Sequence, residues 1–369
     1  MENKDELNVN NVTHSKMDVK TLSRDRWILD CFPEWGTWLN EEIEETVVEE
    51  HKLAMWWLGC TGIYFKTPGG ANVMVDAWVS RGQTTHYING GMEDIDYQMT
   101  RMCGGRKLLP NLKNVPCVID PFLMKNIDAV LVTHIHGDHI DPYVCAAIVQ
   151  NCPEARFIGP LECKNIWVNW GVPEERITVV KPGDRVQVKD MEICALESFD
   201  RTVLLTTPPH GSLKGNIIDM DERAVNYVFR TPDVTVYHSG DSHFCNYYAK
   251  HGQDFDIDVA FGSFGSNAIG VTDKMTACDI CKMAEDLNCK VMIPYHYDLW
   301  TCMKADPFEI EVMWNLQKDR YQFNWKPFIW EVGGKFVYPD DKDKRRYMYP
   351  RGMDDRYTVE PNLPFPCFL

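Results

Sequence analysis

Short apolar runs, many of them rich in β-branched or aromatic residues, recur along the 369-residue chain and predict buried strands. The predicted strands are Ala54–Leu58, Asn72–Asp76, Ile127–Thr133, Ala155–Ile158, Arg176–Val180, Arg185–Leu196, Ala224–Arg230, Val234–His238, Asp258–Ser263, Lys290–Pro294 and Phe328–Val337. Gly333 and Gly334 interrupt the last of these runs. The Thr-Pro-Asp sequence between Arg230 and Val234 predicts a hairpin turn, so the two strands beside it are expected to pair antiparallel.

Segments with helical spacing of their apolar residues lie between these runs. The predicted helices are Trp38–Glu45, Asp141–Asn151, Leu161–Trp170, Phe244–His251, Lys274–Leu287 and Pro307–Arg320, the first preceded by an aromatic-anchored segment at Trp27–Trp35. Hairpins that alternate with strand–helix units predict an α+β fold, in which two sheets carry helices on their outer faces.

The chain is expected to hold one domain. Residues 1–21 are polar and predict a loose N-terminal arm, and residues 22–369 contain no low-complexity linker or internal repeat. The Pro- and aromatic-rich residues 350–369 predict an extended tail that packs on the body or on a neighbouring subunit. No apolar run approaches the ~20 residues of a membrane span, and the polar N-terminus lacks the apolar segment of a secretory signal.

Charge and cysteine content narrow the possible partners and the compartment. The formal net charge of −16 opposes nucleic-acid binding, which needs a basic face. The same charge is compatible with a small anionic substrate, because binding one needs only a few local Arg or Lys residues. The 14 cysteines show no framework spacing and predict reduced thiols in a cytoplasmic protein.

The candidate chemistry centres on His134-Ile-His136-Gly-Asp138-His139, which directly follows a predicted strand. His134 and His136 are two residues apart in an extended segment, so their side chains point the same way and can share one metal ion. Asp138 and His139 can face a second position. Imidazole and carboxylate ligands suit zinc, manganese or iron. The loop leaving a strand is also where open α/β sheets place their chemistry. The cluster therefore predicts a metal-dependent hydrolase.

More distant ligands are expected at other strand ends, because the loops there converge. Asp241 follows Val234–His238 in the sequence Ser-Gly-Asp, and its carboxylate could bridge two ions. His296 follows the strand at Lys290–Pro294 in the same manner. Asp76 closes Asn72–Asp76 and is expected to hold a ligand loop by hydrogen bonds rather than to bind metal.

In this order, these residues resemble the metallo-β-lactamase superfamily. The resemblance implies an αββα sandwich of two mixed sheets with helices on the outer faces. It also implies one more histidine before Asp241, for which His210 in Thr-Pro-Pro-His-Gly is the candidate, although its surroundings match the pattern weakly. The implied ligands are His134, His136, His210 and Asp241 for one ion and Asp138, His139, Asp241 and His296 for a second. Without His210, an enzyme with one ion is expected.

Longer blocks of the chain, from about residue 22 to the C-terminus, are similar to the L-ascorbate-6-phosphate lactonases. They include Phe32–Gly36, Ala54–Gly62, His238–Gly252, Lys326–Trp330 and Pro350–Asp355. The resemblance implies that metal-bound hydroxide attacks the lactone carbonyl of L-ascorbate 6-phosphate and gives 3-keto-L-gulonate 6-phosphate, in bacterial L-ascorbate degradation. It further implies manganese as the metal, with zinc or iron as alternatives, and a cytoplasmic homo-oligomer of six subunits or more.

Individual roles follow from this resemblance as hypotheses. Asp138 could also act as the base that orients the nucleophilic water. Donors to the oxyanion or to the ring hydroxyls are sought among His243, Tyr295 and Tyr297. Candidate phosphate-binding residues are Arg201, Arg223, Lys274 and Arg351.

Two other functions compete with the lactonase. A nuclease or phosphodiesterase of the same fold is opposed by the negative charge and by the lack of an appended nucleic-acid module. A metal-binding sensor or assembly protein with little turnover is opposed by the full ligand set, because a degenerate site usually loses a histidine or the aspartate.

Overall fold

The structure is a computed structural model that describes residues 17–31, 33, 39–80, 116–200, 203, 219–267, 274–297 and 304–348. Most of the expected N-terminal arm and all of the expected tail at residues 350–369 lie outside the described residues. The same holds for His210, Arg201 and Arg351.

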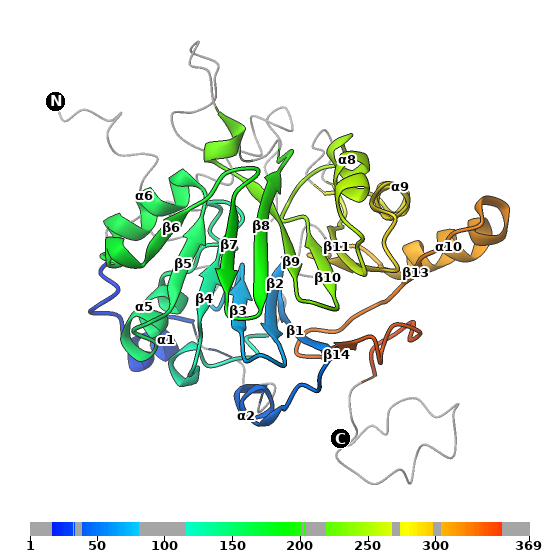
Figure 1. Cartoon of the computed structure of the whole chain (residues 1–369). Coiled ribbons are helices and arrows are strands. Elements are labelled where there is room, and N and C mark those ends of the chain that lie inside the picture. Colours follow the sequence, from blue (N-terminus) through cyan, green and yellow to red (C-terminus); the bar gives the residue numbers. More distant parts are fainter. Residues whose placement is uncertain are drawn as a thin grey trace, which may run out of the picture.

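Two seven-stranded sheets form the body of the molecule (Figure 1). The first has the order β14-β1-β2-β3-β4-β5-β6, with strands Lys335–Tyr338, Leu53–Gly59, Gly62–Lys66, Asn72–Val75, Ala129–Leu131, Arg156–Gly159 and Ile177–Val179. The second has the order β13-β12-β11-β10-β9-β8-β7, with strands Lys326–Pro327, Val291–Tyr295, Val259–Ser263, Thr235–His238, Val225–Arg230, Met191–Glu197 and Arg185–Val188.

Both sheets are mixed, and they face each other across one core. In the first sheet β14, β1, β2 and β3 pair antiparallel, whereas β3 to β6 pair parallel. In the second sheet β7 to β10 pair antiparallel and β10 to β13 pair parallel. Phe65 of β2 stacks on Phe229 of β9 with ring centroids 4.4 Å apart, which joins the two inner faces.

Helices cover the outer faces of both sheets, except the last helix, which projects from the body (Figure 1). They are α1 (Arg24–Cys31), α2 (Leu39–Glu45), α5 (Pro142–Asn151), α6 (Leu161–Asn169), α8 (Tyr247–Asp254), α9 (Ala277–Leu287) and α10 (Phe308–Tyr321), with 3-10 turns at Pro121–Leu123, Glu174–Arg176 and Met220–Glu222. In the described part of the chain, no helix has both the length and the apolar character to span a membrane.

Helix α9 shows how local sequence places an outer element. A capping box formed by Thr276 and Asp279 starts the helix, and Asn288, with a φ of 49°, ends it. Its apolar side packs on β11 and β12. Gly262 of β11 allows this approach, because a Cβ there would lie 2.7 Å from the side chain of Ile280. Helix α9 therefore covers the strands that lead into the candidate site.

The predicted α+β sandwich of two mixed sheets with outer helices is confirmed, and several boundaries are corrected. The strand predicted at Arg185–Leu196 is a hairpin of two strands, β7 and β8, because the chain reverses at Lys189, which has a φ of 50°. Of the run Phe328–Val337, only the end is in a strand, and Ile329 makes a single bridge with Arg346. Strand β2 and helix α1 were not predicted.

Candidate metal centre

Loops that follow five strands bring a cluster of possible metal ligands together. Three overlapping groups have their donor atoms within 4.8 Å of one another: His134, His136 and Asp200; His134, His139 and Asp241; and Cys60, Asp138, His139 and His296. The residues follow β1, β4, β8, β10 and β12, so both sheets contribute. The predicted convergence of the histidine cluster with Asp241 and His296 is present in the structure.

The first group, His134, His136 and Asp200, lies where β4 and β8 end. His134 Nε2 is 2.8 Å from His136 Nδ1 and 3.6 Å from Asp200 Oδ2. The hydroxyl of Thr133 lies 3.0 Å from the other ring nitrogen of His134. Both His134 and Asp200 are about 1% exposed. Asp200 is thus a carboxylate that the structure places with His134 and His136, in a group that sequence analysis did not predict.

The two overlapping groups that share His139 bring together Asp138, His139, His296 and Asp241, called the second group from here on. Its four distances between an imidazole nitrogen and a carboxylate oxygen are similar. His139 Nε2 lies 3.7 Å from Asp138 Oδ1 and 3.4 Å from Asp241 Oδ2. His296 Nε2 lies 3.4 Å from Asp138 Oδ2 and 3.5 Å from the same oxygen of Asp241. Ligands about 2.1 Å from a tetrahedral ion are about 3.4 Å apart. The four side chains therefore have the spacing of ligands around one ion.

Unsatisfied imidazole nitrogens provide a second test of the fit. Within the described residues, Nε2 of His139 and both ring nitrogens of His296 are buried and have no hydrogen-bond partner. Burying a polar nitrogen without a partner costs free energy. A cation between the two Nε2 atoms and the carboxylates would give both of these nitrogens a partner, so the residues present fit a divalent metal.

Asp76 and Thr61 orient His139 from behind. Asp76 Oδ2 lies 2.9 Å from His139 Nδ1 and accepts hydrogen bonds from the hydroxyls of Thr61 and Thr133. Its other oxygen accepts from the backbone N–H of Thr133 at 2.7 Å. This arrangement keeps Nε2 of His139 directed at the cluster, as an outer hydrogen-bond partner of a metal ligand does.

Asp241 stands at the junction of the two groups. Ser263 donates to its Oδ1 at 3.1 Å, and the buried ammonium of Lys274 donates to its Oδ2. Gly240, with a φ of 50°, lets the chain turn here. It also allows close packing, because a Cβ at this position would lie 3.0 Å from the Thr133 side chain. The turn after β10 is therefore packed directly against the turn after β4.

The electrostatics of the cluster favour a cation. Burial lowers the pKa of His296, but the charge of Asp241 and the Cys60 sulfur outweigh it and raise this pKa to about 10. Burial also lowers the pKa of His139, but the charges of Asp241 and Cys60 outweigh it and raise this pKa well above its ordinary value. Despite burial, His139 and His296 hold the pKa of Asp138 well below its usual range. Burial and the neighbouring His139 depress the pKa of His134.

A family model described as a β-lactamase superfamily domain matches residues 72–297, which span β3 to the residues after β12. The chain belongs to the β-lactamase superfamily. Its sequence is 57% identical over 353 residues to the probable L-ascorbate-6-phosphate lactonase UlaG of Escherichia fergusonii, a match that covers 95% of this chain and 99% of the relative. The protein of the same name from Salmonella newport is 56% identical with the same coverage.

Solved structures show the same superfamily fold at low sequence identity. A possible metal-dependent hydrolase from Veillonella parvula superposes with a TM-score of 0.55 at 16% identity, covering 77% of this chain and 98% of that chain. The metallo hydrolase Igni18 from Ignicoccus hospitalis gives a TM-score of 0.52 at 15% identity, covering 78% and 98%. These likenesses support the fold alone.

The residues predicted to contact substrate have partners inside the protein. Lys274 is 3% exposed and bound to Asp241, and the Arg223 guanidinium, also buried, lies 3.9 Å from Glu162. The hydroxyls of Tyr295 and Tyr297 donate to the backbone carbonyls of Gly240 and Trp330. His243 is 4% exposed and lies beside Phe199 in the loop that carries Asp200. The substrate roles of these residues remain predictions.

Sequence reasoning missed Asp200 and Cys60. Both follow strands of this superfamily fold, as Asp76 and Asp241 do, so the rule that found those two aspartates would have found Asp200 after Met191–Glu197. Cys60 was hidden because β2 was not predicted, and the two-residue turn between Gly59 and Gly62 was therefore not recognised.

Proposed function

We propose that this chain hydrolyses the lactone ring of L-ascorbate 6-phosphate to 3-keto-L-gulonate 6-phosphate. The observation that carries the proposal is the set of buried histidines and aspartates spaced as ligands of divalent ions, in a chain closely related to probable lactonases. The chain is accordingly a hydrolase of the metallo-β-lactamase type.

The ligand assignment is part of this proposal. His134, His136, Asp200 and Asp241 would hold one ion, and Asp138, His139, His296 and Asp241 a second. Asp200 takes the place that the superfamily pattern gives to a third histidine, and its Oδ2 lies 3.6 Å from His134 Nε2. His210, the histidine first considered for this place, lies outside the described residues.

A divalent ion in such a site lowers the pKa of water and polarises an acyl oxygen. The chain itself supplies position and charge. Asp138 presents its two oxygens to His139 and His296, so one of them can also hold the nucleophilic water in line. His243 is anchored to the Phe199 carbonyl through its backbone and its ring, which fixes it near the Asp200 loop as a candidate donor to the oxyanion.

The metal that we propose is manganese, with zinc or iron as alternatives. Mixed imidazole and carboxylate donors suit all three ions. Direct metal analysis of the purified protein decides among them. The phosphate-binding residues stay a prediction, because Arg201 and Arg351 lie outside the described residues and Lys274 and Arg223 face carboxylates.

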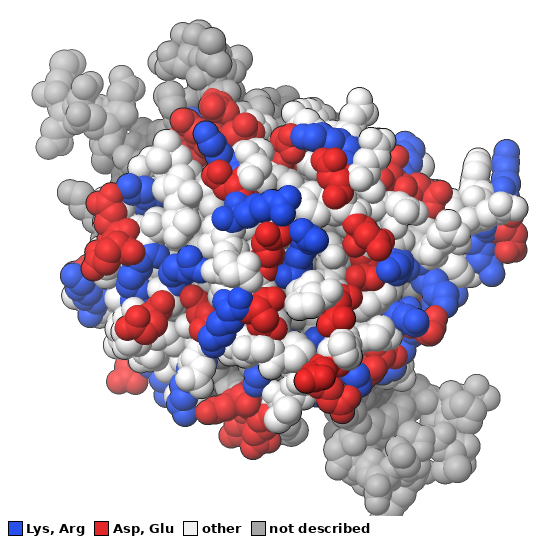
Figure 2. Space-filling model, in the orientation of Figure 1, with Lys and Arg blue, Asp and Glu red and all other residues white. Residues whose placement is uncertain are grey.

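A small phosphorylated lactone, rather than nucleic acid or a membrane, is the proposed partner. The net charge is −16, and Figure 2 shows acidic and basic side chains interspersed over the described part of one face without a continuous basic surface. We also propose a cytoplasmic homo-oligomer of six or more subunits. Support comes from the eleven described cysteines, which are free thiols, and from α10, which projects from the body (Figure 1) with Val312 and Leu316 exposed.

The decisive experiment assays the metal-loaded protein on L-ascorbate 6-phosphate beside a generic phosphodiester and a β-lactam. We expect lactone opening, and we expect His136→Ala to reduce it at least about 100-fold, since loss of an outer partner alone costs 10- to 100-fold in such sites. His51→Ala, which changes an exposed histidine paired with Asp233, is the matched control and should retain activity. An intact lactone after incubation with metal-loaded wild type would refute the proposal.

A further inference from the structure

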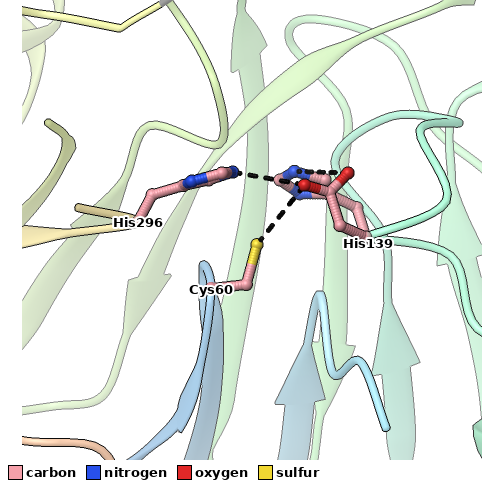
Figure 3. Close-up of side chains that lie close together, drawn as sticks. Cys60, His139 and His296 are labelled. Carbon is pink, nitrogen blue, oxygen red and sulfur yellow. Dashed lines mark hydrogen bonds and ion pairs between the residues drawn. The ribbon is translucent and has the colours of Figure 1, made fainter. Parts of the chain in front are cut away.

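The loop after β8 brings Asp200 to the first group of donor atoms. Asp200 follows the strand by three residues, and its Oδ1 accepts from the backbone N–H of Val203 at 3.0 Å, while its Oδ2 lies 3.6 Å from His134 Nε2. Other members of the cluster also come from separate elements, and Figure 3 shows the side chains of three of them approaching one point. Contacts between the loops therefore decide whether the donor atoms meet.

Ser242 joins the loop after β8 to the loop after β10. Its Oγ accepts from the backbone N–H of Phe199 at 2.9 Å. The backbone N–H of His243 donates to the Phe199 carbonyl at 3.0 Å. The residue immediately before Asp200 is thus bound to the two residues that follow Asp241.

Hydrogen bonds behind Ser242 fix the direction of its hydroxyl. Asn226 Nδ2 donates to the Tyr237 hydroxyl at 2.9 Å, so Asn226 Oδ1 faces Ser242 and accepts from it at 2.9 Å. The Ser198 hydroxyl, 2.7 Å away, must then donate to Ser242, because Ser242 has only one hydroxyl proton. With Phe199 as the second donor, the proton and both lone pairs of this hydroxyl are used.

The backbone of Ser242 is held independently of its hydroxyl. Its N–H donates to the Ser239 carbonyl at 3.0 Å, and its carbonyl accepts from the Tyr248 hydroxyl at 3.1 Å. Ser263 donates to the neighbouring Asp241. The loop after β10 is therefore the fixed side of the junction, and loss of the hydroxyl would release the loop after β8.

We propose that Ser242 is a positioning residue for the metal-dependent reaction, because its hydroxyl ties the loop after β8 in place and so holds Asp200 beside His134. Ser242 and Ser198 are both buried. A buried polar group that loses its partner costs free energy, so without the Ser242 hydroxyl the Ser198 loop gains by moving toward water. That movement would withdraw Asp200 from the group. The inference rests on the proposed function and adds a residue that acts through Asp200.

Titration of the metal-free, full-length protein with Mn²⁺ tests this role without catalysis. The electron paramagnetic resonance signal of the free ion reports how many ions bind and how tightly. Ser242→Ala should weaken the binding of one of the two ions about 10- to 100-fold, the range for residues that orient metal ligands, and change the other much less. Ser242→Cys keeps a side chain of similar size but accepts hydrogen bonds weakly, so it should show the same loss even if the alanine variant does not fold.

A double-mutant cycle separates positioning from a general loss of stability. In the Asp200→Asn background, Ser242→Ala should cause much less further loss of Mn²⁺ affinity, because the carboxylate that Ser242 positions is already absent. Residues that act independently would instead give losses that add.

Thr67→Ala is the matched control at the opposite end of β2 from the cluster. Thr67 is buried, accepts from the backbone N–H of Ala71 at 2.8 Å and donates to Asp190, so its loss removes comparable hydrogen bonds. Its thermal midpoint should fall while the binding of both ions is retained. Unchanged Mn²⁺ binding in folded Ser242 variants, or additive losses in the cycle, would overturn the role of Ser242 and leave the proposed hydrolase intact. A wild type that binds no divalent ion would overturn both.

Discussion

Nδ1 of His139 lies 2.9 Å from Oδ2 of Asp76, and neither residue is exposed. The contact fixes which ring nitrogen of His139 faces the ligand cluster. Asp76 itself has a φ of 47°, a left-handed conformation that its hydrogen bonds to Thr61 and Thr133 hold in place. Asp76, which is outside the three groups of clustered donor atoms, thus determines how His139 is presented to them.

Asp76→Asn tests this relationship. The amide keeps the shape but cannot accept from Thr61, Thr133 and His139 at once, so we expect metal affinity to fall about 10- to 100-fold with the fold retained. Isothermal titration with Mn²⁺ and Zn²⁺ measures the change. Asp258→Asn is the matched control, because Asp258 is a buried aspartate bound to Thr235 and Lys290 at the start of β11. Equal affinity in Asp76→Asn and wild type would contradict the positioning role.

Metal binding by Asp200 and metal binding by His210 predict opposite results for variants of the first group. If Asp200 is the ligand, Asp200→Ala loses about one equivalent of tightly bound metal and most lactone hydrolysis, whereas His210→Ala retains both. The reason is that Asp200 Oδ2 lies 3.6 Å from His134 Nε2 within a buried cluster. Metal content after gel filtration, determined by inductively coupled plasma mass spectrometry, distinguishes the two. Loss of metal and activity in His210→Ala, with both retained in Asp200→Ala, would make His210 the ligand instead.

Metal removal should destabilise the protein, because it leaves Asp138, Asp200 and Asp241 buried close together. Binding to the folded state alone contributes about 2.7 kcal/mol at a free metal concentration 100 times Kd. We therefore expect the thermal midpoint to fall on chelation and to recover when metal is restored. In His136→Ala the recovery should be smaller. A midpoint that does not respond to metal would argue against a preformed site.

Proton release should accompany metal binding. The pKa of His296 is raised to about 10 and that of His139 lies well above its ordinary value, so both imidazoles carry protons near neutral pH that the ion must displace. Metal affinity should consequently increase with pH as long as the pH stays below about 10. Titrations in buffers of different ionisation enthalpy count the released protons. Affinity independent of pH would contradict the assigned ligands.

Most members of the cluster could be predicted from the sequence, because candidate ligands at strand ends leave a local signal. His134, His136 and His139 cluster in a chain with only 11 histidines, and Asp241 and His296 each terminate a short apolar run. Asp200 also stands three positions beyond a strand end, but no neighbouring histidine and no Gly-Asp sequence distinguishes it from the other acidic residues, of which the chain has 54 in all. Its position beside His134 in space identifies it.

The fold errors have a similar cause. Arg185–Leu196 reads as one apolar alternation, and only the left-handed backbone at Lys189 turns it into the β7–β8 hairpin. Residues from Leu53 to Lys66 are almost continuously buried, so periodicity did not separate β1 from β2. The missed boundary concealed a member of the cluster, because the turn between β1 and β2 carries Cys60.

A buried network of hydrogen-bonded side chains lies behind Asp241. Tyr237 donates to His251 at 2.8 Å and accepts from Asn226, which in turn accepts from the Ser242 hydroxyl beside Asp241. His251 Nε2 lies 3.0 Å from Glu197. Burial lowers the pKa of His251 and so favours the neutral imidazole, which can accept from Tyr237 through Nδ1 and donate to Glu197 through Nε2.

Glu197→Gln should remove an acid-sensitive part of the stability. Burial disfavours the Glu197 carboxylate, but hydrogen bonds from Lys250 and His251 outweigh it and lower the pKa to about 2. Because the folded-state pKa is depressed, this stabilisation is fully present above the unfolded value of about 4.3 and is lost as the pH falls toward about 2. We expect urea unfolding to show a deficit of about 1 kcal/mol for the variant near neutral pH that disappears in acid. Glu174→Gln, which breaks the exposed pair with Lys164, is the control and should show a smaller deficit. If the loss of stability in Glu197→Gln were the same in acid, packing rather than the charge of Glu197 would be its cause.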